Sequence, residues 1–104
     1  MTDKNKKVAI VTGASRGIGA AVAARLAADG FAVVVNYSAS SGPAETLVRT
    51  IESTGGRALA AKADVSDADA VRGVFDAAER AFGGVDVLVN NAGIMKLAKI
   101  ADCD

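Results

Sequence analysis

Residues 7–19 read KVAIVTGASRGIG, and this stretch decides the fold. Lys7–Thr12 is an apolar run typical of a buried strand, and Gly17–Asp29, which follows the glycine-rich turn directly, has the pattern of a helix. The first amides of a helix have no partner within it, and the helix dipole adds partial positive charge there. A strand, a glycine turn and a helix in this order therefore predict a phosphate-binding site.

The three glycines of this turn explain how a phosphate could come close to the main chain. Gly13, Gly17 and Gly19 lack a Cβ, and so they leave space for phosphate oxygens. Their spacing, G-x-x-x-G-x-G, differs from the common dinucleotide fingerprint G-x-G-x-x-G, and a ligand-free glycine turn is the alternative. The flanking strand and helix favour a dinucleotide. A phosphate-loop NTPase is excluded because Ala20 and Ala21 stand where its Lys and Ser or Thr are needed.

Strand-like and helix-like segments alternate along the rest of the chain. Pro43 suits the first turn of a second helix, which Gly55 and Gly56 end. Ser66, with Asp69 three residues later, resembles a capping box that opens a third helix ending at Gly83. The predicted strands are Lys7–Thr12, Phe31–Asn36, Arg57–Lys62 and Val85–Val89.

This alternation predicts an α/β fold. Parallel neighbouring strands need crossover helices, and these pack on both faces of the sheet. We therefore expect a Rossmann-like, doubly wound parallel sheet in three α/β/α layers, with four strands of a longer sheet present. We treat residues 1–104 as one dinucleotide-binding segment, because no linker, repeat or low-complexity tract divides them.

Polar residues gather where each predicted strand ends. In doubly wound sheets, ligands bind at the carboxyl ends of the strands, beside the point where the strand order reverses. The candidates at these ends are Ser15, Arg16, Asn36, Tyr37, Ser38, Asp64, Asn90 and Asn91.

Composition excludes several other classes of function. Lys and Arg together number 12 and Asp and Glu together number 12, so the formal net charge is zero and nucleic acid is not an expected partner. The chain has no histidine and one cysteine, Cys103, which excludes a Cys/His metal site and an intramolecular disulfide. The polar N-terminus has neither a signal-peptide core nor a membrane span, so we expect a cytoplasmic protein.

Three motifs in register identify a family. They are TGASRGIG at Thr12–Gly19, the pair Asp64 and Val65 after the third strand, and NNAG at Asn90–Gly93. In sequence, order and separation the chain resembles the short-chain dehydrogenase/reductases, of the acyl-carrier-protein ketoreductase and glucose dehydrogenase type. The resemblance covers nearly the whole chain.

The resemblance implies a role for each matching residue. Asp64 would accept a hydrogen bond from the adenine amino group, Val65 would pack on the ring, and Asn90 would tie the central strands together. Taken alone, Asp64 would be a solvated loop carboxylate and NNAG a turn that closes a strand. The resemblance places Gly13, Ser15, Gly17, Ile18 and Gly19 around the pyrophosphate and adjacent ribose, and Asn91, Ala92 and Gly93 beside the cofactor near its ribose.

Charge near the second strand favours NADP over NAD. NAD-binding folds hold the ribose 2′-hydroxyl with a carboxylate near the end of this strand, whereas a 2′-phosphate calls for Arg or Lys. No Asp or Glu occurs between Phe31 and Ala44. Arg16 can pair with a phosphate through its guanidinium, and Asn36, Tyr37 and Ser38 add neutral hydrogen-bonding groups on the same side.

The family's catalytic residues have no counterpart in this chain. In the family, a tyrosine transfers the proton on the substrate oxygen, a lysine four residues later lowers its pKa, and a serine orients the carbonyl. Tyr37 is the only tyrosine, and Ser41 lies four residues beyond it. We therefore expect the cofactor-binding half of a longer oxidoreductase that acts on a small carbonyl or alcohol substrate, inactive as this segment alone.

Two other functions remain open at this point. A non-catalytic dinucleotide-binding module would also lack the tyrosine and lysine. A sugar-nucleotide epimerase of the related extended group is possible too, although its glycine loop normally has a different spacing. By analogy with the family, we expect a homo-oligomer, commonly a tetramer.

Overall fold

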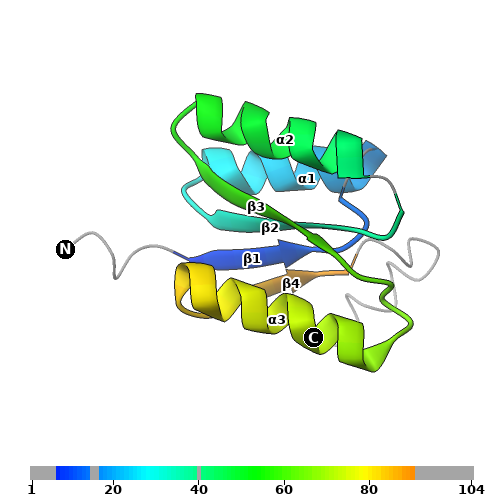
Figure 1. The fold of residues 1–104 in the computed structure, drawn as a ribbon. Helices are drawn as coiled ribbons and strands as arrows, with labels where there is room; N and C mark the ends of the chain where they lie inside the picture. Colours follow the sequence, from blue (N-terminus) through cyan, green and yellow to red (C-terminus); the bar gives the residue numbers. More distant parts are fainter. Residues whose placement is uncertain (1–6, 15–16, 40, 91–104) are drawn as a thin grey trace.

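The computed structural model describes residues 7–14, 17–39 and 41–90, and over these residues strands and helices alternate (Figure 1). The observed bounds differ from the predicted ones by one or two residues at most ends, and those of β3 agree with the prediction. The strands are β1 (Val8–Val11), β2 (Ala32–Tyr37), β3 (Arg57–Lys62) and β4 (Val87–Val89). The helices are α1 (Gly17–Ala28), α2 (Ser41–Ser53) and α3 (Ala68–Phe82).

The strands form one parallel sheet in the order β3-β2-β1-β4. Ile10 of β1 pairs with Val34 of β2 on one side and with Leu88 of β4 on the other. The chain first builds outward from β1 through β2 to β3 and then returns to the opposite side of β1. The order therefore reverses between β1 and β4, which confirms the doubly wound α/β fold.

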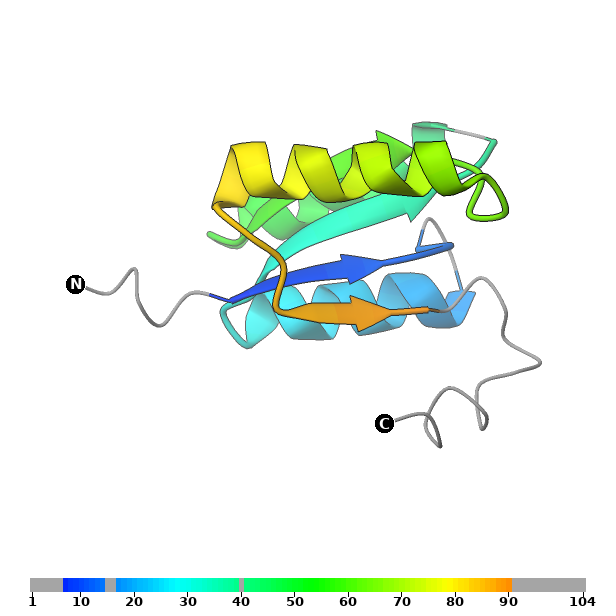
Figure 2. The same ribbon diagram turned by 90° about the horizontal axis from the view of Figure 1, so that it is seen from below.

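Helices cover both faces of the sheet, as the two views show (Figures 1 and 2). Alternate residues of β2 face opposite layers: Val33 and Val35 pack with α1 and α2, whereas Ala32 and Val34 pack with α3. All four side chains are fully buried, as expected for a β-branched run at the centre of a parallel sheet. The molecule thus has the predicted three layers.

Small side chains let the helices approach this sheet. Ala23 of α1, Ala44 of α2 and Ala78 of α3 are each completely buried. Helix α3 lies against β1, β2 and β3 and leaves the same face of β4 less covered. Leu88, on the face that Ile10 shares, is consequently 48% exposed.

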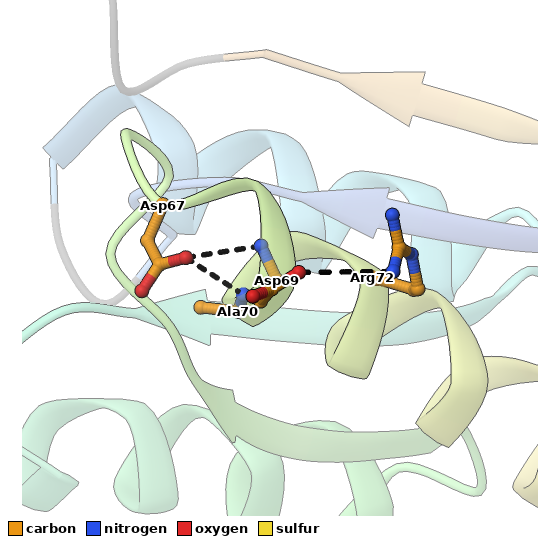
Figure 3. Close-up of polar contacts among 4 residues, drawn as sticks. All are labelled: Asp67, Asp69, Ala70 and Arg72. Atoms are coloured by element: carbon orange, nitrogen blue, oxygen red, sulfur yellow. Dashed lines mark hydrogen bonds and ion pairs between the residues drawn. The ribbon is translucent and has the colours of Figure 1, made fainter.

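The prediction that Ser66 and Asp69 form a capping box at the start of α3 is wrong. Asp67 is the N-cap, and its Oδ1 accepts hydrogen bonds from the amides of Asp69 at 3.0 Å and Ala70 at 3.3 Å (Figure 3). Asp67 is one residue closer to the helix than Ser66 is. The Ser66 hydroxyl bonds to Asp64 instead. At the other end Gly83 is the predicted stop, with the left-handed φ of 93° that favours glycine.

The fourth strand was predicted to begin at Val85, two residues earlier than the structure shows. The side chain of Asp86 accounts for the difference. The amide of Val8 donates to Asp86 Oδ2 at 2.8 Å, and the amide of Asp86 donates to the carbonyl of Val8 at 2.8 Å. A carboxylate thus takes the place of a main-chain acceptor, and the strand pairing begins at Val87.

Among the described residues, no helix combines the length and the apolar character that a membrane crossing requires.

Candidate dinucleotide-binding site

The candidate site lies along the carboxyl edge of the sheet, where the ends of the parallel strands meet. Thr12 follows β1, Asp64 comes two residues after β3, and Asn90 follows β4. Asn36 is the penultimate residue of β2. The topology therefore brings these four positions to one edge of the sheet, and Thr12 and Asn90 flank the point between β1 and β4 where the strand order reverses.

The turn after β1 uses glycine for its conformation. Gly13 has a φ of 58° and Gly17 a φ of 68°, both in the left-handed region that side chains rarely adopt. A Cβ added to Gly17 would meet no atom within 4 Å, so conformation rather than space selects glycine at that position. Gly17 also begins α1, which spans 12 residues and has no acidic residue in its first turn. The positive end of the helix dipole therefore meets no carboxylate from that turn.

Asn36 lies beneath this turn and is only 2% exposed. Its Oδ1 accepts a hydrogen bond from the amide of Gly13 at 3.1 Å. Its Nδ2 donates to the carbonyls of Ala61 at 3.3 Å and Ala63 at 3.2 Å. Both ends of the carboxamide are therefore bonded within the protein. The sequence reasoning, which grouped Asn36 with Tyr37 and Ser38, could not show this burial.

The two residues after Asn36 differ in their surroundings. Tyr37 is half-buried and packs against the apolar cluster formed with α1 and α2. Ser38 is exposed. Of the three neutral groups predicted near the second strand, Ser38 thus presents the most accessible side chain.

Asp64 is an exposed carboxylate with a fixed orientation. Its Oδ1 accepts hydrogen bonds from the amide of Ser66 at 2.9 Å and from the Ser66 hydroxyl at 2.7 Å. These bonds, the one from the amide first, hold the pKa of Asp64 below its ordinary value. The two bonds thus favour the ionised form of the carboxylate.

The ends of β1 and β4 are joined through Thr12. Its amide donates to the carbonyl of Val89 at 2.9 Å, and its hydroxyl lies 3.2 Å from Asn90 Oδ1 and 3.4 Å from that carbonyl. Thr12 is nearly buried, whereas Asn90 is exposed. Asn90 is therefore attached to the central strand at the edge where the site lies.

A cavity of about 130 Å³ opens at this edge, between α3 and the sheet. Its polar lining comes from Thr12, Asn36 and Asn90. Its apolar wall includes Val65, which is 40% exposed, and Phe75 of α3. The lining of this cavity is therefore mostly apolar, with three polar residues.

Five predicted site residues lie outside the described residues. They are Ser15, Arg16, Asn91, Ala92 and Gly93. Of the predicted site residues that are described, Gly13 and Asn36 are in direct contact through a hydrogen bond. Asn90 bonds to Thr12. Ile18 of α1 is 58% exposed. In residues 7–14, 17–39 and 41–90, no three His, Cys, Asp or Glu side chains are arranged to hold a metal ion.

The sequence placed Thr12 in the glycine motif and Ser66 at a helix cap, but the bonds of Thr12 to Asn90 and of Ser66 to Asp64 were not predicted. Ser66 follows Asp64 at the two-residue spacing at which an Asp side chain commonly bonds the backbone ahead of it, so this signal was available. Thr12 carried no such signal, because its partner Asn90 is 78 residues away along the chain.

The chain is similar to a family of known proteins. A family model described as short chain dehydrogenase matches residues 7–104. An uncharacterised oxidoreductase of Methylorubrum extorquens is 52% identical over 102 residues, which are 98% of this chain and 41% of that protein. A 3-oxoacyl-[acyl-carrier-protein] reductase of Synechocystis is 50% identical over 96 residues, which are 92% of this chain and 39% of that protein.

A solved structure supports the same grouping. The short chain dehydrogenase of Burkholderia cenocepacia, crystallised in complex with NADP, is 54% identical and superposes with a TM-score of 0.77. The match covers 81% of this chain and 34% of the other. The chain thus spans about two fifths or less of the length of these relatives.

Proposed function

The chain belongs to the short chain dehydrogenase family, and from this premise we propose that the intact protein is an NADP-dependent oxidoreductase. It transfers a hydride between the nicotinamide and the carbonyl or alcohol carbon of a small substrate. Residues 1–104 supply cofactor binding. The observation that carries the proposal is the glycine turn at the switch point of the sheet, followed by a helix with no acid in its first turn.

The described residues fit a dinucleotide. The start of α1 offers amides and a positive dipole end to the diphosphate, and the left-handed Gly13 and Gly17 shape the turn before it. We assign to Asp64, whose Oδ1 is held by Ser66, the hydrogen bond from the adenine amino group. Val65 supplies an exposed apolar surface for the ring. When bound, the cofactor would give or accept the hydride, and these residues would hold and orient it.

The choice of NADP rests on charge. No acid occurs between Phe31 and Ala44, so no carboxylate from this segment opposes a 2′-phosphate. Ser38 is exposed at the end of β2 and offers a hydroxyl to the phosphate. We assign to Arg16 the bidentate pairing with that phosphate. The Burkholderia relative, solved with NADP, supports this choice by analogy.

The proton-transfer residues lie elsewhere in the intact protein. Tyr37, the only tyrosine, has no lysine four residues later and packs on the α1 and α2 side of β2. We therefore assign cofactor binding to this chain and proton transfer to other residues of the intact protein. We place the intact protein in the cytoplasm and, by analogy with the family, in a homo-oligomer.

The experiment is a reductase assay on the full-length protein that the gene encodes. NADPH oxidation is followed with a panel of small carbonyl compounds, in wild type and in the Arg16→Gln variant. We expect Arg16→Gln to raise KM for NADPH about tenfold and to leave KM for NADH unchanged, because one charge-assisted interaction is lost. Arg25→Gln is the matched control, since Arg25 lies on α1 but pairs at the surface with Asp29 at 3.3 Å.

Two outcomes would contradict the proposal. Binding of NADPH without turnover of any carbonyl or alcohol would favour a non-catalytic dinucleotide-binding module. An equal rise in KM for both cofactors in Arg16→Gln would remove the assigned role of Arg16.

A further inference from the structure

Asn36 holds two consecutive amides of the glycine turn. Its side-chain Oδ1 accepts from the amide of Gly13 at 3.1 Å, and its main-chain carbonyl accepts from the amide of Ala14 at 2.8 Å. One residue of β2 therefore fixes the direction in which the chain leaves β1. The side chain is 2% exposed, so water does not compete strongly for these bonds.

The position requires a carboxamide. One end of the side chain faces a donor, the Gly13 amide, and the other faces two acceptors, the carbonyls of Ala61 and Ala63. A carboxylate could accept from Gly13 but could not donate to the carbonyls, and alanine could do neither. Asn36 thereby links the carboxyl ends of β1, β2 and β3 through one buried group.

We propose that Asn36 is a positioning residue for the cofactor, acting through Gly13 rather than by touching the nucleotide. This inference rests on the proposed function, in which the glycine turn holds the diphosphate. The diphosphate is common to NADP and NAD, whereas the 2′-phosphate is present in NADP only. Loss of the Asn36 side chain therefore weakens the binding of NADP and of NAD by the same factor. The ratio of the two affinities stays unchanged.

The test measures dissociation constants of NADP⁺ and NAD⁺ for the full-length protein by calorimetry. The variants are Asn36→Ala and the milder Asn36→Ser, each measured well below its own unfolding temperature. We expect Asn36→Ala to raise both constants on the order of tenfold, because one buried hydrogen bond to the turn is lost. Asn36→Ser should give a smaller rise in both and remains informative if Asn36→Ala does not fold.

A second variant separates positioning from general loss of stability. Val34 is fully buried on the same face of β2, two residues before Asn36, and belongs to the cluster against α3. Val34→Ala should lower the unfolding temperature and leave both dissociation constants unchanged. The amide resonance of Gly13, observed in glycine-labelled protein without cofactor, should shift in Asn36→Ala and stay in place in Val34→Ala.

The outcomes distinguish this inference from the proposed function. A wild-type protein that binds neither dinucleotide would overturn the proposed function and the inference with it. If wild type binds, a rise confined to NADP⁺ would mean that Asn36 contacts the 2′-phosphate side directly and would overturn the inference alone. Unchanged constants in both Asn36 variants would overturn it as well.

Discussion

Ser66 bonds to Asp64 twice, through its amide at 2.9 Å and its hydroxyl at 2.7 Å, and both bonds reach the same carboxylate oxygen, Oδ1. The two donors orient an exposed acid at the carboxyl edge of the sheet, where the adenine of the cofactor is expected. One oxygen of the Asp64 carboxylate is thus held by the protein itself.

The first prediction concerns the pKa of Asp64. The amide bond and the hydroxyl bond lower this pKa from 3.8. Ser66→Ala removes the hydroxyl bond, so the pKa should rise part of the way back, as followed by the Asp64 carboxyl carbon resonance in a pH titration. Ser53→Ala, which removes an exposed hydroxyl bonded to the carbonyl of Thr50 at the end of α2, should leave it unchanged.

The sign of the pH dependence follows from the direction of this shift. Because the folded-state pKa is lowered, Asp64 stabilises the native state at pH values above the unfolded value, and the contribution disappears as the pH falls through the folded value. Ser66→Ala should reduce this acid-dependent part of the free energy of unfolding. An unchanged Asp64 titration in Ser66→Ala would show that the hydroxyl bond is absent in solution.

The second prediction concerns the start of α3 (Figure 3). Asp67 caps two helix amides, so Asp67→Ala should lower the free energy of unfolding by about 1 kcal/mol, and Asp67→Ser should recover most of it. Arg72→Ala should have little effect, because Arg72 and Asp69 form an exposed pair at 3.7 Å. Urea unfolding measures all three. An Asp67→Ala variant as stable as wild type would contradict the assignment of the cap.

The third prediction compares two glycines. Gly17 has a φ of 68°, so Gly17→Ala should destabilise the protein by about 1 kcal/mol although there is room for the methyl group. Gly73 lies inside α3, also with room for a Cβ, and Gly73→Ala should stabilise by about 0.5–1 kcal/mol. Thermal unfolding measures both. Effects of the same sign would mean that the turn does not hold Gly17 in the left-handed region.

Much of the fold could be predicted from local pattern. The run AVVVN within β2 is buried on both faces, and such a run is typical of a central parallel strand. The glycines at 55 and 83 were predicted to end the second and third helices, and α2 and α3 end at Ser53 and Phe82. These features depend on neighbours in sequence, which is why sequence alone was sufficient.

The features that the sequence did not predict depend on competition between nearby groups or on contacts across the sheet. Ser66 and Asp67 are both good N-caps; in the structure Asp67 bonds the helix amides, and the Ser66 hydroxyl bonds to Asp64 instead. The burial of Asn36 depends on Gly13, 23 residues earlier, and on Ala63, 27 residues later. The strand alternation places Asn36 on the face of Val34, but it does not show that the turn closes over it. The roles of Arg16 and of NNAG stay predictions.

The most direct test of the account is the ratio of the dissociation constants of NADP⁺ and NAD⁺ for the full-length wild-type protein at one pH and ionic strength. The account predicts that NADP⁺ binds about tenfold or more tightly, since a charge-assisted pairing with the 2′-phosphate is worth at least about 1.4 kcal/mol. Equal affinities, or tighter binding of NAD⁺, would contradict it.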